Sequence, residues 1–172
     1  LLSITEFGEL NGFFGGSDTP FSIGNHVWLD DGQGVGGVLN DGIRQAGELP
    51  AYDTVNGVGV RVNLYRDGNN NGVADSGELI RYDLTDTNGF YLFDNLDHGP
   101  YIVQIPKSEF ADGKLLAGWY SSQPTETDPD TNGDLNDNGI NTDFPHTDGV
   151  FSGVVHLEET PAEPENESHL SL

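Results

Sequence analysis

Segments in which every second residue is apolar recur along most of the chain. In residues 58–65 the apolar side chains fall on one face of an extended strand, and residues 101–105 show the same period of two. Pro106 ends the latter segment, because proline has no N–H to donate to a sheet. The segments in which we expect strands are 21–29, 58–65, 79–85, 90–93, 101–105, 115–121 and 150–157.

Turn-forming residues separate these segments. The chain contains 24 glycines, and Asn88-Gly89 is typical of a tight hairpin turn between two strands. Residues 107–116 are the one helix candidate, and Gly113 interrupts them. Short strands joined by turns predict an all-β fold, specifically an antiparallel β-sandwich.

A length of 172 residues fits one domain with a short appendage. We expect residues 21–172 to form the sandwich and residues 1–20 to form an N-terminal extension. Leu2 and Ile4 alternate with polar residues as in a strand, and the glycine-rich stretch that follows is typical of a tether. The extension is therefore a candidate donor strand for a neighbouring molecule, and the alternative is a frayed terminus.

The charge balance is strongly negative. Asp and Glu number 29 against 6 Lys and Arg, which gives a formal net charge of −23, and there is no cysteine. This charge argues against a nucleic-acid partner, which needs a basic surface, and against attraction to an anionic membrane. No apolar run approaches the ~20 residues that span a bilayer, so we expect no direct membrane insertion. Divalent cations are the natural counter-charge, because they relieve the self-repulsion of the folded state.

Residues 67–78 fit the twelve-residue calcium-binding loop. That loop surrounds one ion with side-chain oxygens from its first, third, fifth and ninth residues, a carbonyl from its seventh, and a closing two-oxygen Glu. The flanking segments alternate like strands, so we do not expect the flanking helices of an EF-hand. The alternative is an acidic hairpin loop without an ion. The expected calcium ligands are Asp67, Asn69, Asn71, Val73, Asp75 and Glu78.

Two further acidic segments match parts of this loop. Residues 40–48 match its second half, although Gln45 stands where an acid is preferred, and the first ligand lies before an inserted glycine-rich stretch. The expected ligands there are Asp30, Asp41, Ile43 and Glu48, and the alternative is a solvated loop. Residues 128–139 repeat the opening spacing but have no closing Glu, so we expect them to lend a few ligands to a shared site. Those ligands are Asp128, Asp130, Asn132 and Asp134.

Blocks of sequence, in order, resemble the B-type domains of serine-aspartate repeat surface adhesins, the SdrD B-like domains. Residues 23–30 are similar to the opening IGxxVWxD of that family, and residues 40–48 to its NGIQDxGE segment. Residues 57–65 are similar to its GVxVxLY strand, and residues 89–103 reproduce GxYxFxxLxxGxYxV with the same spacing. Residues 128–139 resemble its late DxDxxG loop.

The resemblance implies a Cna-B-like or prealbumin-like β-sandwich that binds calcium (Ca2+) and serves as a repeated stalk or scaffold in extracellular proteins. It covers roughly residues 21–157 and implies calcium roles for Asp30, Asp41, Glu48, Asp128 and Asp130. The chain departs from the pattern of the family in the residues inserted after Asp30 and in the complete loop at 67–78. It also lacks the closing DFGF strand of the family.

The sequence contains no nucleophile elbow, phosphate loop or paired-histidine metal motif, so we do not expect an enzyme. The predicted function is that of a structural module outside the cell, on a bacterial cell surface or in a secreted fibre. Its expected partners are copies of itself, joined head to tail by the N-terminal strand, or adjacent domains of a surface protein. The alternative is an adhesin module that recognises a protein or a glycan, which an aromatic platform with convergent polar groups would favour.

Overall fold

A computed structural model describes residues 20–122, 139–140 and 142–158 of the chain. Most regular elements in these ranges are β-strands, and all of their pairings are antiparallel, so the predicted all-β antiparallel fold is confirmed. The strands are β1 (Phe21–His26), β2 (Trp28–Leu29), β3 (Leu49–Pro50), β4 (Tyr52–Asp53), β5 (Val58–Gly59), β6 (Arg61–Arg66), β7 (Leu79–Leu84), β8 (Phe90–Leu96), β9 (Gly99–Ile105), β10 (Val150–Phe151) and β11 (Val155–Leu157).

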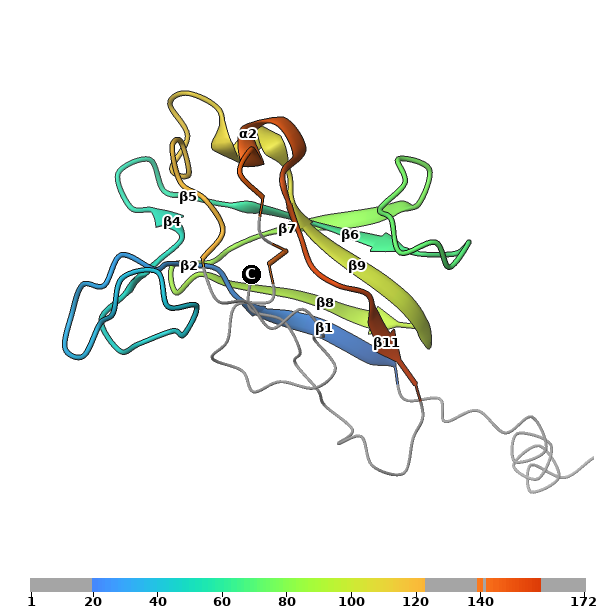
Figure 1. The fold of residues 1–172 in the computed structure, drawn as a ribbon. Coiled ribbons are helices and arrows are strands. Elements are labelled where there is room, and N and C mark those ends of the chain that lie inside the picture. The colour runs from blue at the N-terminus through green and yellow to red at the C-terminus, as the bar shows by residue number, and fades with distance from the viewer. Residues whose placement is uncertain (1–19, 123–138, 141, 159–172) are drawn as a thin grey trace, which may run out of the picture.

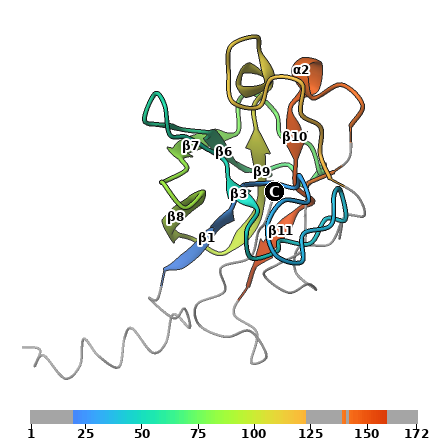
Figure 2. The same ribbon diagram turned by 90° about the vertical axis from the view of Figure 1, so that its left-hand side faces the viewer.

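The strands form two facing layers, as Figure 1 and Figure 2 show. One layer is a five-stranded sheet in the order β10-β9-β6-β7, in which β11 also pairs with β9. The other layer contains the pair β1-β8, and two short pairs, β2-β3 and β4-β5, continue the chain between the layers. The predicted strand at 150–157 is therefore present as two pieces on the same neighbour.

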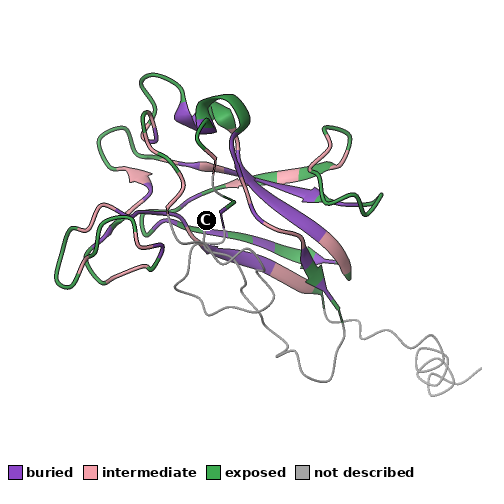
Figure 3. Ribbon diagram, in the orientation of Figure 1, coloured by how far each residue is buried: buried purple, intermediate pink, exposed green. Residues whose placement is uncertain are grey.

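The core lies between these layers and follows the period-two pattern of the sequence. Tyr91 and Phe93 of β8 belong to one apolar cluster with Val62 and Leu64 of β6, and none of the four is more than 1% exposed. Figure 3 shows buried positions alternating with exposed ones along β8. Tyr91 and Phe93 are thus core residues, which leaves their rings unavailable to a ligand.

The predicted strand at 21–29 is broken at Val27 because the chain changes partners there. Its N–H donates to the carbonyl of Gly89 (2.8 Å), next to β8, and its carbonyl accepts the N–H of Ala51 (2.9 Å), next to β3. Before Val27 the chain pairs with β8, and after it the chain pairs with β3. This switch carries the chain out of the small sheet and into the segment that contains Asp30.

The turns after β9 differ from the sequence expectation. The predicted helix at 107–116 is reduced to a 3-10 turn, η1 (Lys107–Phe110), and the predicted strand at 115–121 is wrong. Successive turns replace both, because the N–H of Trp119 donates to the carbonyl of Leu116 (3.0 Å) and Gly113 takes a left-handed φ of 83°. A short helix that was not expected, α2 (Pro145–Asp148), precedes β10.

Polar side chains close the side of the sandwich at which β7 meets β8. The carboxylate of Asp83 accepts the N–H of Leu92 (3.0 Å), and Arg81 forms an ion pair with Asp94 (3.6 Å). These side chains occupy backbone groups of β8 that face β7, and charged groups of this kind protect a strand edge from adding another strand. Within the described ranges, no helix has the length and apolar character needed to cross a membrane.

Candidate metal centre

Two acidic loops carry most of the predicted calcium ligands, and they lie at opposite ends of the sandwich (Figure 1). The first loop, residues 30–48, connects β2 to β3, and the second loop, residues 67–78, connects β6 to β7. Each loop begins directly after one strand and ends directly before the next. The strands therefore fix both ends of each loop, which is what a rigid ion site requires.

In the second loop, Asp67 organises the turn around its own carboxylate. Oδ1 accepts the N–H of Asn71 (3.0 Å) and Oδ2 accepts the N–H of Gly72 (2.9 Å), and Asp67 is only 2% exposed. Gly72 has a φ of 71°, a left-handed conformation that glycine adopts without steric cost. The first residue of the predicted site is thus buried and the loop is wrapped around it.

Glu78 closes the second loop from its other end. Oε1 accepts the N–H groups of Gly68 (2.9 Å) and Asn69 (3.3 Å), whereas Oε2 is buried and has no hydrogen-bond partner. A buried carboxylate oxygen without a partner is costly, because it has lost water and gained nothing in exchange. A cation at this oxygen would satisfy it, and the closing Glu of a calcium loop normally binds its ion with both oxygens.

In the first loop, Asp30 reaches across the inserted stretch. Its Oδ1 accepts the N–H of Asn40 (2.7 Å), ten residues further along the chain, and its Oδ2 accepts the N–H of Gly42 (2.9 Å). Asp30 is 6% exposed and Glu48 is 5% exposed. The structure therefore brings Asp30 together with the second half of the broken pattern, and the assignment of Asp30 as its first ligand stays a prediction.

The surroundings of Glu48 in the first loop disfavour the ionised form of its carboxyl group. Burial raises the pKa of its carboxyl above the ordinary 4.5, and the neighbouring negative charges of Asp30 and Asp41 raise it further, against a hydrogen bond from the N–H of Gln45. Oε2 accepts that N–H (2.8 Å), and Oε1 is buried without a partner. A buried carboxylate that is disfavoured by two neighbouring negative charges and has one unsatisfied oxygen would be stabilised by a divalent cation.

The two loops share their left-handed backbone conformation at the fourth and sixth positions. Asn40 and Asn70 are left-handed, with φ of 57° and 54°, and Gly42 and Gly72 follow with 69° and 71°. In both loops the first Asp accepts the N–H of this glycine, and the residue before the glycine accepts the N–H of the residue after it. Each loop also ends on a Glu with one buried oxygen that has no partner.

The loops differ by an exchange of acid and amide at the fifth and ninth positions. The first loop has Asp41 and Gln45, and the amide of Gln45 donates to the carboxylate of Asp41 (2.8 Å to Oδ2). The second loop has Asn71 and Asp75, and the amide of Asn71 donates to the carboxylate of Asp75 (3.0 Å). Each loop therefore keeps one carboxylate and one amide in this pair.

The remaining predicted ligands are placed as follows. The side chains of Ile43 and Val73 are 45% and 53% exposed, as suits residues expected to contribute only a carbonyl. The amide of Asn69 donates to Asp75 (3.0 Å), beside that of Asn71. Over the described ranges, no three His, Cys, Asp or Glu side chains are close enough to hold a metal by themselves, so a site in either loop needs amide and carbonyl oxygens as well. The third cluster lies outside the described residues and comprises Asp128, Asp130, Asn132 and Asp134.

Comparison with known proteins relates about half of the chain to small parts of much longer proteins. The chain is 36% identical over 93 residues to serine-aspartate repeat-containing protein I of Staphylococcus saprophyticus, and 37% identical over 93 residues to protein F of Staphylococcus epidermidis. It is also 36% identical over 91 residues to Colossin-A of Dictyostelium discoideum. The matches cover 52–54% of this chain but only 4%, 4% and 1% of the relatives. No protein-family model matches the chain.

The chain is thus an all-β sandwich with two acidic loops of one design, and it is related to serine-aspartate repeat-containing proteins. The relationship predicted from the sequence blocks is confirmed at this level. The matches do not single out the B-type domain within those proteins.

Proposed function

We propose that this chain is a non-enzymatic, extracellular structural module of the SdrD B-like type, stabilised by calcium in its first and second loops. The observation that carries the proposal is the repeated loop design, in which each closing Glu leaves one buried oxygen without a partner. Calcium prefers hard oxygen ligands and tolerates the mixture of carboxylate, amide and carbonyl groups that the loops offer. With a net charge of −23, the fold also gains from each bound cation.

The relatives support a structural role in place of catalysis. None of the three proteins described above is named as an enzyme, and two of them are named for a repeated sequence. In the part of the chain that the structure describes, the acidic residues expected as ligands in both loops accept hydrogen bonds from backbone and side-chain amides of their own loop. This arrangement stiffens the connections between strands, which suits a link in a cell-surface stalk or secreted fibre.

Thermal melting in millimolar calcium and in EDTA tests the stabilisation. Binding to the folded state alone contributes about 4 kcal/mol at a thousandfold excess over Kd, which shifts Tm by roughly 10 °C for a domain of this size. Equal melting temperatures under both conditions would contradict the proposal. Calorimetry should then count one ion fewer in Glu48→Gln and one fewer in Glu78→Gln, because each change weakens the closing ligand of one loop while preserving its shape.

We further propose that subunits join head to tail, with residues 1–10 of one copy added as a strand to the next. The small layer has two strands, β1 and β8, among the described residues, and Arg81 and Asp83 close the side of β8 that faces β7. An added strand would therefore extend this layer beside β1. Residues 1–19 lie outside the described ranges, so the donor is proposed from its alternating sequence alone.

Deletion of residues 1–10 tests the assembly separately from the calcium sites. The shortened protein should fold, bind calcium and remain monomeric, whereas the full chain should form filaments visible by electron microscopy. Filaments formed equally well by the shortened chain would contradict strand addition and leave calcium stabilisation unaffected.

A further inference from the structure

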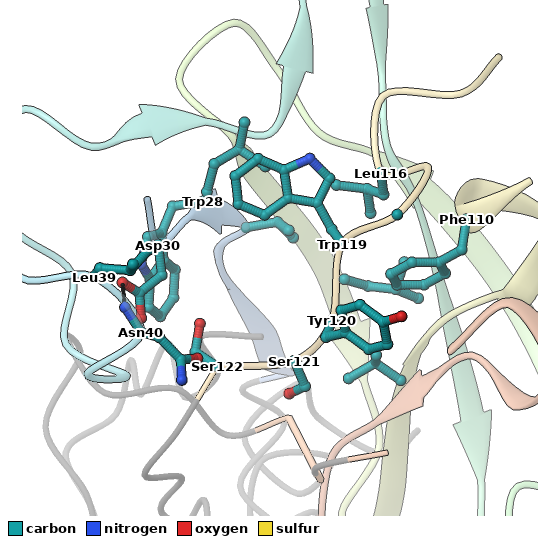
Figure 4. Close-up of a pocket in the computed structure, with 15 residues that line it drawn as sticks. Trp28, Asp30, Leu39, Asn40, Phe110, Leu116, Trp119, Tyr120, Ser121 and Ser122 are labelled. Atoms are coloured by element: carbon teal, nitrogen blue, oxygen red, sulfur yellow. Dashed lines mark hydrogen bonds between the residues drawn. The ribbon is translucent and has the colours of Figure 1, made fainter. Parts of the chain in front are cut away.

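A cavity of about 220 Å³ lies beside the first loop, and the proposed structural role does not use it. Figure 4 shows Asp30, Leu39 and Asn40 on one side of this cavity and Trp119, Tyr120 and Phe110 across from them. Core residues, among them Val27 and Ile105, form its base, and Ser121 and Ser122 also line it. The cavity is therefore apolar at its base, aromatic on one wall and polar along the other.

The aromatic wall differs from the aromatic residues of the core. Tyr91 and Phe93 are enclosed in the core, whereas Tyr120 is 62% exposed and Trp119 is half-buried, packed against the core at its edge. The wall is formed by the successive turns that replace the expected strand at 115–121. These turns direct aromatic side chains to a solvent-accessible cavity in place of the sandwich interior.

Trp28 also contributes to the cavity lining, and it is 7% exposed. Its ring therefore adds apolar surface close to the aromatic wall, and the polar groups of the cavity come from other residues, among them Asp30, Ser121 and Ser122.

We propose that the cavity binds one ring of a neutral carbohydrate. Its volume is below the 300–1,000 Å³ that is typical for drug-sized ligands, so it accommodates a single ring. The C–H face of a sugar ring is apolar and packs on Trp119 and Tyr120, while its hydroxyl groups have partners in Asp30 and Ser122. The net charge of −23 disfavours anionic sugars, which selects neutral ones.

Asp30 connects this cavity to the first loop. Its carboxylate holds the loop by accepting the N–H groups of Asn40 and Gly42, and the same residue lines the cavity wall. Calcium in the first loop would fix Asp30 and thereby the polar wall. Carbohydrate binding should accordingly be stronger in calcium than in EDTA. This calcium dependence rests on the calcium proposal, whereas the carbohydrate binding itself does not.

Intrinsic fluorescence provides a direct test, because the chain contains 2 tryptophans and both line the cavity. The full chain is titrated with glucose, galactose, mannose and N-acetylglucosamine, each up to about 100 mM, since isolated rings bind in the millimolar range. At least one sugar should give a saturable change in emission. The absence of a saturable change with all four sugars, in calcium and in EDTA, would overturn the proposal.

Matched variants locate the binding. Tyr120→Ala removes an exposed ring without disturbing the core, and it should weaken binding about tenfold. Tyr82→Ala removes another exposed ring, 56% exposed and on β7 away from the cavity, and it should bind as the unaltered chain does. Equal binding by both variants would overturn the assignment. A saturable response to a synthetic peptide of residues 1–20, with none to the sugars, would also overturn it and would assign the cavity to self-assembly.

Discussion

In both the first and the second loop, the first Asp accepts the N–H of the left-handed glycine, but the sequence separation between these two residues differs. In the second loop, the first Asp binds amides four and five residues further on, so the whole site is local in sequence. In the first loop, Asp30 binds amides ten and twelve residues further on, across an inserted segment. The shared features are the left-handed Asn and Gly and the acceptance of the glycine N–H by the first Asp. The origin of the first ligand is free to vary.

The inserted segment changes what surrounds the first loop. Gly34 folds back against Gly47, so closely that a Cβ on Gly47 would lie 2.7 Å from the Cα of Gly34. The equivalent residue of the second loop, Gly77, has no atom within 4 Å of such a Cβ. The first loop is thus packed against its own insertion, whereas the second is open to solvent at this point.

Alanine substitution at these two equivalent glycines should give the largest difference between the loops. Gly47→Ala forces a backbone clash at a φ of 136°, and we expect a loss of about 2–3 kcal/mol in the free energy of unfolding. Gly77→Ala should change it by no more than about 0.5 kcal/mol, because the side chain has space there. Urea unfolding measures both values, and equal effects would show that the insertion does not pack as described.

The acid–amide exchange can be tested next. Asp41→Asn alone removes a carboxylate from the first loop and should weaken its calcium affinity about tenfold. Adding Gln45→Asp gives the first loop the arrangement of the second and should restore most of that affinity. Calorimetry on the single and double variants distinguishes the two cases. A double variant as weak as the single one would mean that the positions are not interchangeable.

The contrast between the loops also shows what could be predicted from the sequence. The calcium-loop pattern of the second loop is readable in the sequence because its twelve positions are contiguous. The proximity of Asp30 to residues 40–42 followed from the same spacing after the insertion. The compensating role of Gln45 could not be predicted, because it depends on a side-chain hydrogen bond to Asp41 that no spacing rule describes.

Sequence patterns also did not predict features that form only when segments distant in the sequence pack together. The alternating pattern predicted one buried face for β6, yet Asn63 on the other face is also buried, where its amide donates to Gln104 on β9 (2.9 Å). The cavity was missed because residues 115–121 were expected to form a strand. The aromatic side chains of that segment acquire their role only when the turns place them across from Asp30.

Neutralising the closing Glu should affect the calcium-free loops differently. Glu48 is 5% exposed and faces two like charges, so Glu48→Gln should raise the free energy of unfolding in EDTA by about 1 kcal/mol or less. In millimolar calcium the same change should lower it, because one ion is lost. Glu78 is more exposed, and Glu78→Gln should be nearly neutral in EDTA. Melting curves for both variants under both conditions reveal the reversal, and a destabilised Glu48→Gln in EDTA would contradict it.

The pH dependence of calcium binding is the smallest expected effect, and it follows from the same carboxyl group. Burial and the charges of Asp30 and Asp41 raise the folded-state pKa of Glu48 above 4.5. Protons therefore compete with calcium for this ligand, so affinity is full above the raised pKa and decreases as pH falls through it. Without calcium the sign is opposite, because ionised Glu48 destabilises the fold. Stability in EDTA should rise as pH falls through the raised pKa and gain nothing further from this group below 4.5.

Each loop can be measured separately with the closing Glu of the other removed. In Glu78→Gln only the first loop retains its full ligand set, and its calcium affinity should fall severalfold, roughly two- to tenfold, between pH 7 and pH 5. Glu48→Gln reports the second loop over the same range and serves as the control for general effects of acid on the protein. An affinity of the first loop that does not change with pH would mean that Glu48 is not a ligand. The two loops would then share a backbone conformation without sharing a function.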